Sequence, residues 1–490
     1  MNKRPLPIAI IGAGFAGIGT AIRLKQSGIE SFTIFERAGE IGGTWRDNTY
    51  PGAACDVPSH VYSLSFEPNP DWTHKFSPSA EIQAYLLRLV EKWQLRSRLR
   101  LRTEIVDARF DEARGTWTLT TATGETHEAR VIVAGVGGLV DPAVPDIKGL
   151  HSFTGEIFHT ARWNHDYDLT GRSVAVIGTG ASAVQVVPSI APQVAKLSVF
   201  QRTPAWVVPK MDKRYSERER RFYARHPLVL RAKRFAMYAL SEIFGPMVFL
   251  DSKRLSALGE GISMRHLHAQ VRDPELRRKL TPHFQFGCKR VLVSDDYWAS
   301  FERENVELVT EPIAEVRREG IETKDGRLHE VDALVLATGF ALGLATAPFA
   351  VTGRGGRTLD DAWRGGAVAY KGMTVSGFPN WFTLMGPNTG PGHTSVLVFT
   401  EAQIEHALQA IRKIRDEDLR FVDVRQEVQD RYNAGIQARM PRMVWHTCQS
   451  WYLSPDGSNH ALYPGFAAEY ALRARRFRTR DYEIARFSGV

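Results

Sequence analysis

Six residues near the start of the chain have the spacing of a phosphate-binding glycine turn. The run is Gly12-Ala13-Gly14-Phe15-Ala16-Gly17. The first glycine allows a tight turn, the second lets a pyrophosphate approach the backbone, and the third permits close helix–strand packing. Other α/β proteins contain similar glycine-rich turns, so the surrounding elements decide what this one means.

Those surroundings favour a dinucleotide site. An apolar strand is expected at 8–11, a helix at 18–27 and a second strand at 31–35, which ends at Glu36. A carboxylate at that position can accept both hydroxyls of an adenosine ribose and would repel a 2′-phosphate. The site therefore suits FAD or NAD, but not NADP. Its predicted residues are Gly12, Gly14, Phe15, Gly17 and Glu36.

A second turn of the same kind follows an apolar strand expected at 172–177. It reads Gly178-Thr179-Gly180-Ala181-Ser182-Ala183, with alanine at the third glycine position, which the motif tolerates. The next strand, 196–200, ends at Gln201-Arg202-Thr203, so an arginine stands where the first site has an acid. A guanidinium there suits the 2′-phosphate of NADP. The alternative is a surface arginine at a strand end.

One site has an acid at the ribose position and the other has an arginine there. The two sites together suggest electron transfer from NADPH to FAD. The final acceptor could be a disulfide, a quinone or molecular oxygen. The lack of paired cysteines near the first site argues against disulfide reduction. The sequence contains neither HExxH nor GxSxG, and we expect no metal site.

Two strand–turn–helix starts predict an α/β protein with two dinucleotide-binding, Rossmann-like domains. The 490 residues are enough for two or three domains. We expect a discontinuous FAD-binding domain and an NADP-binding domain with a helical insertion. The respective ranges are 1–145 with 335–490, 146–334, and about 211–282 for the insertion.

Charge and cysteine content narrow the range of partners and of cellular locations expected for the protein. The net charge is +9, and the basic segment 211–240 is expected to be a solvated helical face, with a membrane or partner surface as the alternative. We expect no nucleic-acid partner and no integral membrane segment, since Glu242 interrupts the longest apolar stretch. Cys55, Cys288 and Cys448 lie far apart, which argues against a disulfide framework and favours the cytoplasm.

Three further motifs carry a family resemblance. Residues 153–163, from Phe153 to Trp163 through His159, match the pattern FxGxxxHxxxW. Residues 42–56 match GGxWxxxxYPGxxxD, and Ala-Thr-Gly at 337–339 resembles a strand-end motif of flavin monooxygenases. Over nearly its whole length the chain resembles the Baeyer–Villiger monooxygenases.

The resemblance implies a reaction. Enzymes of this family use NADPH to reduce FAD, and oxygen then gives a C4a-peroxyflavin that converts a ketone into an ester or lactone. The expected small-molecule partners are therefore a ketone and O2. The cofactor supplies the chemistry, while the protein holds it and excludes water.

The resemblance also implies residue roles. Arg290, in the pair Lys289-Arg290, would stabilise negative charge on oxygen, and Asp56 would orient Arg290. Lys289 would help Arg202 and Thr203 hold the 2′-phosphate, and Trp451 would close over the nicotinamide. Further cofactor contacts are expected from Thr44, Trp45, Asp47, Tyr62, Val106, Gln185 and Val396. The signature residues His159 and Trp163 are expected to couple NADPH binding to domain movement.

Two alternatives stay open at this point. One is N- or S-oxygenation by the same type of enzyme. The other is a non-catalytic, NADPH-sensing flavoprotein that uses 211–240 as its partner surface. The sequence discloses neither the ketone nor the oligomeric state.

Overall fold

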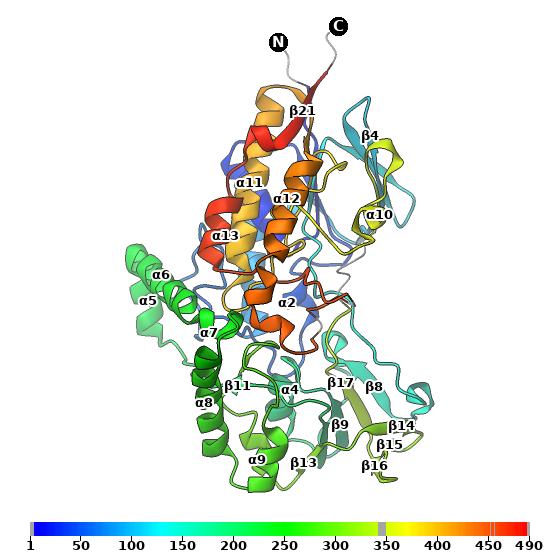
Figure 1. Ribbon diagram of the computed structural model, residues 1–490, viewed down its shortest axis with the longest axis vertical. Coiled ribbons are helices and arrows are strands. Elements are labelled where there is room, and N and C mark those ends of the chain that lie inside the picture. Colours follow the sequence, from blue (N-terminus) through cyan, green and yellow to red (C-terminus); the bar gives the residue numbers. More distant parts are fainter. Residues whose placement is uncertain (1–3, 342–348, 451, 455, 488–490) are drawn as a thin grey trace.

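The computed structural model describes most of the chain, namely residues 4–341, 349–450, 452–454 and 456–487. Figure 1 shows an elongated molecule in which the strands β8, β9, β13 and β17 and the helix α9 lie toward one end. The helices of residues 396–474 lie toward the other end, close to both termini. Segments from the start and the end of the sequence therefore build the same half.

The first parallel sheet has the strand order β19-β7-β1-β2-β3. Every residue of β1 and β7 is buried, because helices and a second layer of structure cover both faces of the sheet. This explains their uninterrupted apolar sequences, IAII and VIVA. The strand bounds, in sheet order, are Trp381–Thr383, Val131–Ala134, Ile8–Ile11, Phe32–Phe35 and Leu99–Arg100.

The second parallel sheet has the order β13-β10-β9-β17-β8. The predicted boundary between 334 and 335 falls inside β17, whose four residues all pair with β8 and β9. Each sheet thus contains the βαβ unit that its glycine turn predicts. The strand bounds, in sheet order, are Val306–Val309, Lys196–Phe200, Ser173–Ile177, Ala333–Leu336 and Glu156–His159.

One predicted strand is divided in two. The apolar run predicts a single strand over 127–135, but β6 (Thr126–Ala129) ends before Arg130 and β7 begins after it. The Arg130 side chain is buried and donates a hydrogen bond to the Leu419 carbonyl, so the chain turns there and changes sheet. β6 belongs to a four-stranded sheet with β18 (Ala350–Thr352), β4 (Ile105–Asp111) and β5 (Thr116–Thr121).

The remaining described strands form smaller sheets. β14, β15 and β16 form an antiparallel sheet, β11 pairs with β12, and β20 pairs with β21. Their bounds, in that order, are Ile313–Arg317, Gly320–Thr323, Leu328–Glu330, Val207–Val208, Leu292–Val293, Leu419–Val424 and Tyr482–Arg486.

The helical insertion contains five helices. Their starts follow local sequence signals: Ser216 and Glu219 form a capping box before α5, Pro227 opens α6, and Asp273 caps α9. Among the described residues, no helix is long and apolar enough to cross a membrane. The bounds of α5 to α9 are Glu217–Arg225, Pro227–Phe244, Pro246–Phe249, Lys253–Gln270 and Pro274–Leu280.

The largest hydrophobic core lies between the first sheet and helices α1, α3 and α11. α1 follows the first glycine turn, and α11 packs along it although almost 370 residues separate the two in sequence. The helices outside the insertion are α1 (Phe15–Gln26), α2 (Thr44–Asp47), α3 (Ser79–Lys92), α4 (Ala183–Ile190), α10 (Leu359–Trp363), α11 (Val396–Asp416), α12 (Gln426–Gln437) and α13 (Ala467–Ala474).

Candidate active site

The first glycine turn has the backbone geometry that a bound pyrophosphate requires. Gly12 adopts a φ of +95°, and a Cβ there would lie 2.5 Å from the Gly135 carbonyl oxygen. A Cβ on Gly17 would lie 1.9 Å from the Gly12 oxygen, so the third glycine lets α1 pack on the turn. Gly14 caps α1 with no side-chain hydrogen bond, and a Cβ placed on it would meet only one atom within 4 Å. The N-terminal amides of α1 are therefore accessible to an anionic group.

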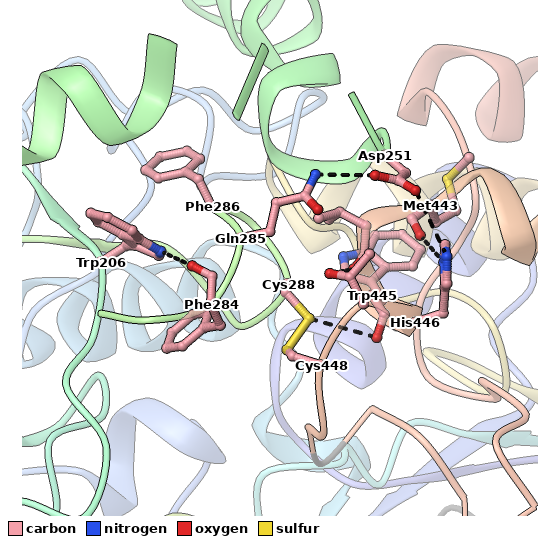
Figure 2. Close-up of a disulfide and its surroundings, with 12 residues drawn as sticks. Trp206, Asp251, Phe284, Gln285, Phe286, Cys288, Met443, Trp445, His446 and Cys448 are labelled. Atoms are coloured by element: carbon pink, nitrogen blue, oxygen red, sulfur yellow. Dashed lines mark hydrogen bonds and ion pairs between the residues drawn. A yellow bond between two sulfur atoms is a disulfide. The ribbon is translucent and has the colours of Figure 1, made fainter. Parts of the chain in front are cut away.

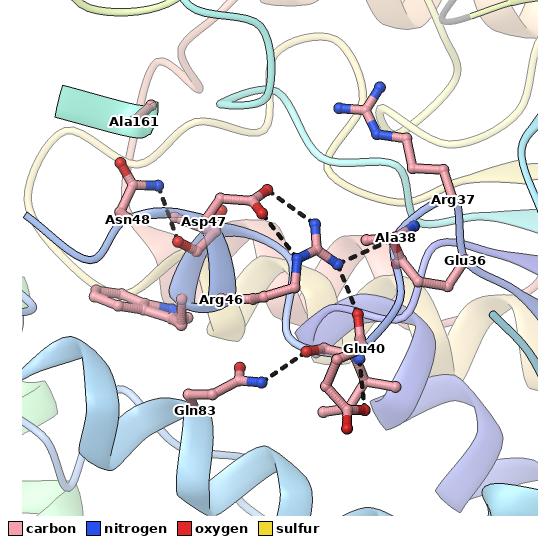
Figure 3. Close-up of polar contacts among 12 residues, drawn as sticks. Glu36, Arg37, Ala38, Glu40, Arg46, Asp47, Asn48, Gln83 and Ala161 are labelled. Carbon is pink, nitrogen blue, oxygen red and sulfur yellow. Dashed lines mark hydrogen bonds and ion pairs between the residues drawn. The ribbon is translucent and has the colours of Figure 1, made fainter. Parts of the chain in front are cut away.

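Glu36 lies at the end of β2, beside this turn. The backbone amide of Ala38 donates to Oε1, and the amide of Ala13 donates to Oε2, both at 2.9 Å. Figure 3 shows Glu36 and Ala38 with the neighbouring Arg46. The Glu36 side chain is buried, with 5% of the residue exposed. Each carboxylate oxygen can accept more than one hydrogen bond. The position therefore fits the ribose-binding acid of a dinucleotide site.

Arg46 is a site residue that the sequence analysis missed. Its guanidinium forms a bidentate pair with Asp47 at 2.8 and 2.9 Å and also donates to Glu36 at 3.0 Å (Figure 3). It thus fixes the predicted residue Asp47 against the predicted residue Glu36. An arginine directly before an acid in the Thr44–Asp47 segment was the available signal, but its partner 10 residues upstream is not encoded by spacing.

Aromatic rings form one wall of the first site. The indole NH of Trp45, on α2, donates to the Tyr62 hydroxyl at 3.0 Å. The Tyr62 ring also makes an edge contact with Phe15, with ring centroids 5.2 Å apart. Val396 opens α11 and packs against the same core, whereas Val106 on β4 is 40% exposed. The structure thus brings Phe15, Trp45 and Tyr62 together and leaves Val106 outside this wall.

The second glycine turn repeats the geometry of the first. Gly178 has a φ of +120°, and a Cβ there would lie 2.4 Å from the Ala337 oxygen. No described atom lies within 4 Å of a Cβ placed on Gly180, which leaves its backbone open to a ligand. Ala181 and Ser182 lead into α4, and Ala183 is fully buried at its start, where it replaces the third glycine. The Thr179 hydroxyl donates to the Thr203 carbonyl at 2.7 Å and ties the turn to the end of β10.

The charges of two cations interact near the second turn. Burial, and secondly the positive charge of Arg202, lowers the pKa of Lys289. These residues are 87 positions apart, and neither forms an ion pair with an acid in the described part of the chain. Neighbouring cations without a carboxylate suit a phosphate, since both can donate charge-assisted hydrogen bonds to it. Together with Thr203 they fit the expected 2′-phosphate site.

Gln185, which is predicted to contact a cofactor, forms side-chain hydrogen bonds within the protein. Its amide oxygen accepts hydrogen bonds from the Tyr50 hydroxyl at 2.8 Å and from the Ala54 amide at 3.3 Å. Its amide nitrogen donates to the Ala54 carbonyl at 3.0 Å. Gln185 therefore holds the loop that leads to Asp56 against α4, and Tyr50 is a positioning residue that the sequence analysis did not single out. A direct contact of Gln185 with the cofactor stays a prediction.

Asp56 and Arg290 form the ion pair that the resemblance implies. The Nε and Nη2 atoms of Arg290 both donate to Oδ2 of Asp56, at 3.1 and 2.5 Å. The Asp56 carboxylate raises the pKa of Arg290. The Arg290 side chain retains 44% of its accessible surface, so the cation is fixed and still reachable.

Two tyrosines place this ion pair relative to the rest of the site. Burial raises the pKa of Tyr62, and the charges of Asp56 and Arg290 contribute with opposite signs. Burial also raises the pKa of Tyr452 to about 12, while Arg290 acts against this shift. The charges of the ion pair therefore reach both Tyr62, in the aromatic wall of the first site, and Tyr452, in the C-terminal segment. Trp451, the predicted nicotinamide contact, lies outside the described residues.

The expectation of no disulfide is wrong for one pair of cysteines. Cys288 and Cys448 are bonded, with their Cα atoms 6.1 Å apart (Figure 2). The bond joins the segment of Lys289 and Arg290 to the segment that precedes Tyr452. Sequence separation, here 160 residues, does not measure spatial separation. Cysteine spacing therefore no longer supports a cytoplasmic location, which stays a prediction.

The signature residues His159 and Trp163 lie at the second sheet. His159 ends β8, and its Nδ1 accepts a hydrogen bond from the Ala161 amide at 3.0 Å. Trp163 makes an edge contact with Phe158, with ring centroids 4.8 Å apart. Both lie far from Asp56 and Arg290 in the sequence, and they interact with Ala161 and Phe158, respectively. Their role in coupling domain movement stays a prediction.

Known proteins resemble this chain over its whole length. A family model described as "Pyridine nucleotide-disulphide oxidoreductase" matches residues 9–220. A Baeyer–Villiger monooxygenase of Pseudomonas aeruginosa is 45% identical over 99% of this chain and 94% of its own length. Another, from Streptomyces coelicolor, is 43% identical over 98% of this chain and 92% of its own length.

Solved structures agree with these relatives. A structure of OTEMO in complex with FAD and NADP has a TM-score of 0.88 at 28% identity. Cyclohexanone monooxygenase from Rhodococcus sp. Phi1, bound to NADP+, has a TM-score of 0.87 at 28% identity. Each match covers 99% of this chain and 100% of the other. The predicted fold class is confirmed, and the chain belongs to the Baeyer–Villiger monooxygenase family.

Proposed function

We propose that this protein binds FAD at the first glycine turn and NADPH at the second, and uses O2 to convert a ketone into an ester or lactone. The observation that carries the proposal is the placement of two consecutive cations. The charge of Lys289 interacts with that of Arg202, which follows β10 near the second turn, whereas Arg290 pairs with Asp56 near the aromatic wall of the first. This supports a role for one short segment at both proposed nucleotide sites. The solved relatives with FAD and NADP support this assignment.

The chain also supports a division into two binding domains. Residues 1–145 and 335–490 would bind FAD, and residues 146–334 would bind NADP, with β17 at the junction. The four residues Thr44 to Asp47 and the helix α11 then belong to the FAD side. The hydrogen bonds of Gln185 to Tyr50 and Ala54 would couple the two domains close to Asp56.

The residues of the site have separable roles. When bound, FAD would supply the redox chemistry that activates oxygen, with NADPH as the hydride source. The fixed positive charge of Arg290 stabilises the negative charge that develops on oxygen during the reaction. Asp56 orients the guanidinium and balances its charge. Arg202, Thr203 and Lys289 bind the 2′-phosphate and so favour NADPH over NADH.

Replacement of Arg290 tests the proposal. We expect Arg290→Ala to bind FAD and to accept hydride from NADPH, but to lose ester and lactone formation from a panel of linear, cyclic and aromatic ketones. Arg415→Ala is the matched control, because Arg415 pairs with its neighbour Asp416 at the end of α11. Products are identified by mass spectrometry. Normal lactone formation by Arg290→Ala would overturn the role of Arg290.

The same experiment separates the rival functions. If the wild-type protein oxygenates amines or sulfides but none of the ketones, it is an N- or S-oxygenating enzyme. If NADPH reduces the flavin slowly and ketones do not stimulate oxygen consumption, the protein is a sensor and the proposal fails.

A further inference from the structure

Exposed apolar side chains concentrate on one part of the helical insertion. Of the fifteen large hydrophobic residues that are exposed in the described part of the chain, nine lie on α5, α6 and α8. Leu228, Phe235 and Ile243 expose 76%, 70% and 68% of their surface. The nine residues are Phe222, Leu228, Val229, Phe235, Leu240, Ile243, Phe244, Leu258 and Ile262.

These residues form a continuous face on α6. Leu228, Phe235 and Ile243 are separated by seven and eight positions, which is about two helical turns each. Figure 1 shows α5 and α6 projecting from the side of the molecule. We call the side of α6 that carries Leu228, Val229, Phe235, Leu240, Ile243 and Phe244 the outer face.

The opposite side of α6 packs on the protein through Leu230, Arg234 and Tyr238. Arg234 donates hydrogen bonds to the carbonyls of His60 and Ser63, at 2.5 and 2.9 Å. At the margin of the outer face, Glu242 Oε1 lies 3.2 Å from His393 Nε2 and accepts from the Ala467 amide. A surface helix of a globular protein normally turns its apolar side inward and its charges toward water. The exposed apolar side of α6 departs from this arrangement and indicates an apolar neighbour.

The charges beside the outer face favour one class of neighbour. Residues 211–234 contain nine Lys and Arg against three Asp and Glu. Arg218, Arg225 and Arg231 are exposed, and none of them forms an ion pair with an acid that the structure describes. A second copy of the chain would bring the same cations together around an apolar contact, which is unfavourable. An anionic lipid surface offers both an apolar layer and complementary charge.

We propose that the outer face of α6 docks peripherally into the interface of an anionic lipid bilayer, with Phe222 of α5 beside it and Arg218, Arg225 and Arg231 at the headgroups. α6 has 18 residues and is about 27 Å long, so it can lie along the surface. Peripheral binding agrees with the finding that no described helix could span the membrane. The proposal does not depend on the reaction that the enzyme catalyses.

Vesicle flotation with the purified full-length protein tests this. We expect binding to vesicles of equal parts phosphatidylglycerol and phosphatidylcholine, and at least about tenfold weaker binding to phosphatidylcholine alone. The double variant Phe235→Glu/Ile243→Glu should lose at least about tenfold in binding to the anionic vesicles. Val144→Glu is the matched control, since Val144 is an exposed apolar residue far from the insertion in sequence. Thermal unfolding followed by circular dichroism shows whether each variant is folded.

A second variant tests the charge separately. Arg225→Gln/Arg231→Gln should weaken binding to anionic vesicles and leave the weak binding to neutral vesicles unchanged. The proposal is wrong if the wild-type protein binds neither kind of vesicle, or binds both equally well. It is also wrong if the protein forms dimers that Phe235→Glu/Ile243→Glu abolishes, because the outer face would then be an interface between two copies.

Discussion

Arg290 directs two nitrogen atoms at a single oxygen of Asp56, and the second oxygen of that carboxylate stays outside the pair. A guanidinium held in this way cannot rotate freely, although 44% of its side-chain surface remains accessible. The charge is therefore both fixed in position and available to a reacting oxygen. This is the arrangement that electrostatic stabilisation requires, because the donor does not have to reorganise during the reaction.

The first prediction concerns the carboxylate. Asp56→Asn removes the negative charge but keeps the size of the side chain, so Arg290 loses the group that orients it. We expect the rate of ketone oxygenation to fall about 100-fold while NADPH still reduces the flavin. Steady-state rates with and without ketone measure this. Asp71→Asn, at an exposed loop position, is the control and should keep the wild-type rate. An unchanged rate in Asp56→Asn would show that Arg290 is oriented by other contacts.

The second prediction concerns the choice of nicotinamide cofactor. Arg202→Ala removes one of two cations from the expected 2′-phosphate site. A hydrogen bond to a charged group contributes about 1.5–3 kcal/mol, so the KM for NADPH should rise about 10- to 100-fold. The KM for NADH should change little, because NADH lacks the phosphate. Arg172→Ala is the control, since Arg172 contacts the ring of Tyr167 instead. Equal effects on both cofactors would contradict the assignment.

The third prediction concerns the disulfide. Cys448→Ser opens a covalent loop of 160 residues and so increases the conformational entropy of the unfolded chain. The loss in the free energy of unfolding should be at most about 5 kcal/mol. Chemical denaturation measures it. Dithiothreitol should lower the Tm of the wild-type protein and leave that of Cys448→Ser unchanged. A wild-type Tm that does not respond to the reductant would show that the bond contributes no stability.

The fourth prediction concerns pH. Lys371 is 5% exposed, and burial lowers its pKa to about 8 from a usual value near 10.5. Below pH 8 the lysine is charged in both the folded and the unfolded protein, and the folded protein must bury that charge. Lys371→Met should therefore increase the free energy of unfolding at pH 7 by up to about 3 kcal/mol. The advantage should disappear between pH 8 and 10.5, where the unfolded lysine also loses its proton.

Denaturation of both proteins at several pH values measures this difference. Lys324→Met is a suitable control, because Lys324 is exposed. If Lys371→Met and the wild-type protein differ by the same amount at every pH, the lysine does not carry the pH dependence.

The sequence by itself determined the local elements of the two nucleotide sites. Gly12 and Gly178 have positive φ angles, and each follows a buried strand, as the spacing predicts. Glu36 and Arg202 each lie just after the second strand of their βαβ unit. These features could be read because strand and helix periodicity, turn residues and strand ends are properties of neighbouring residues. The family resemblance added Asp56 and Arg290, which the structure brings together.

Only the tertiary structure decided which distant residues meet. It brought the charges of Lys289 and Arg202 close enough to interact, bonded Cys288 to Cys448, and used Gln185 to hold the loop that leads to Asp56. It also turned the apolar side of α6 outward, although the composition of 211–240 alone favoured a solvated helical face. Helical periodicity fixes which residues share a face, but not the direction of that face. Direction and long-range contacts depend on the path of the whole chain, which local sequence does not encode.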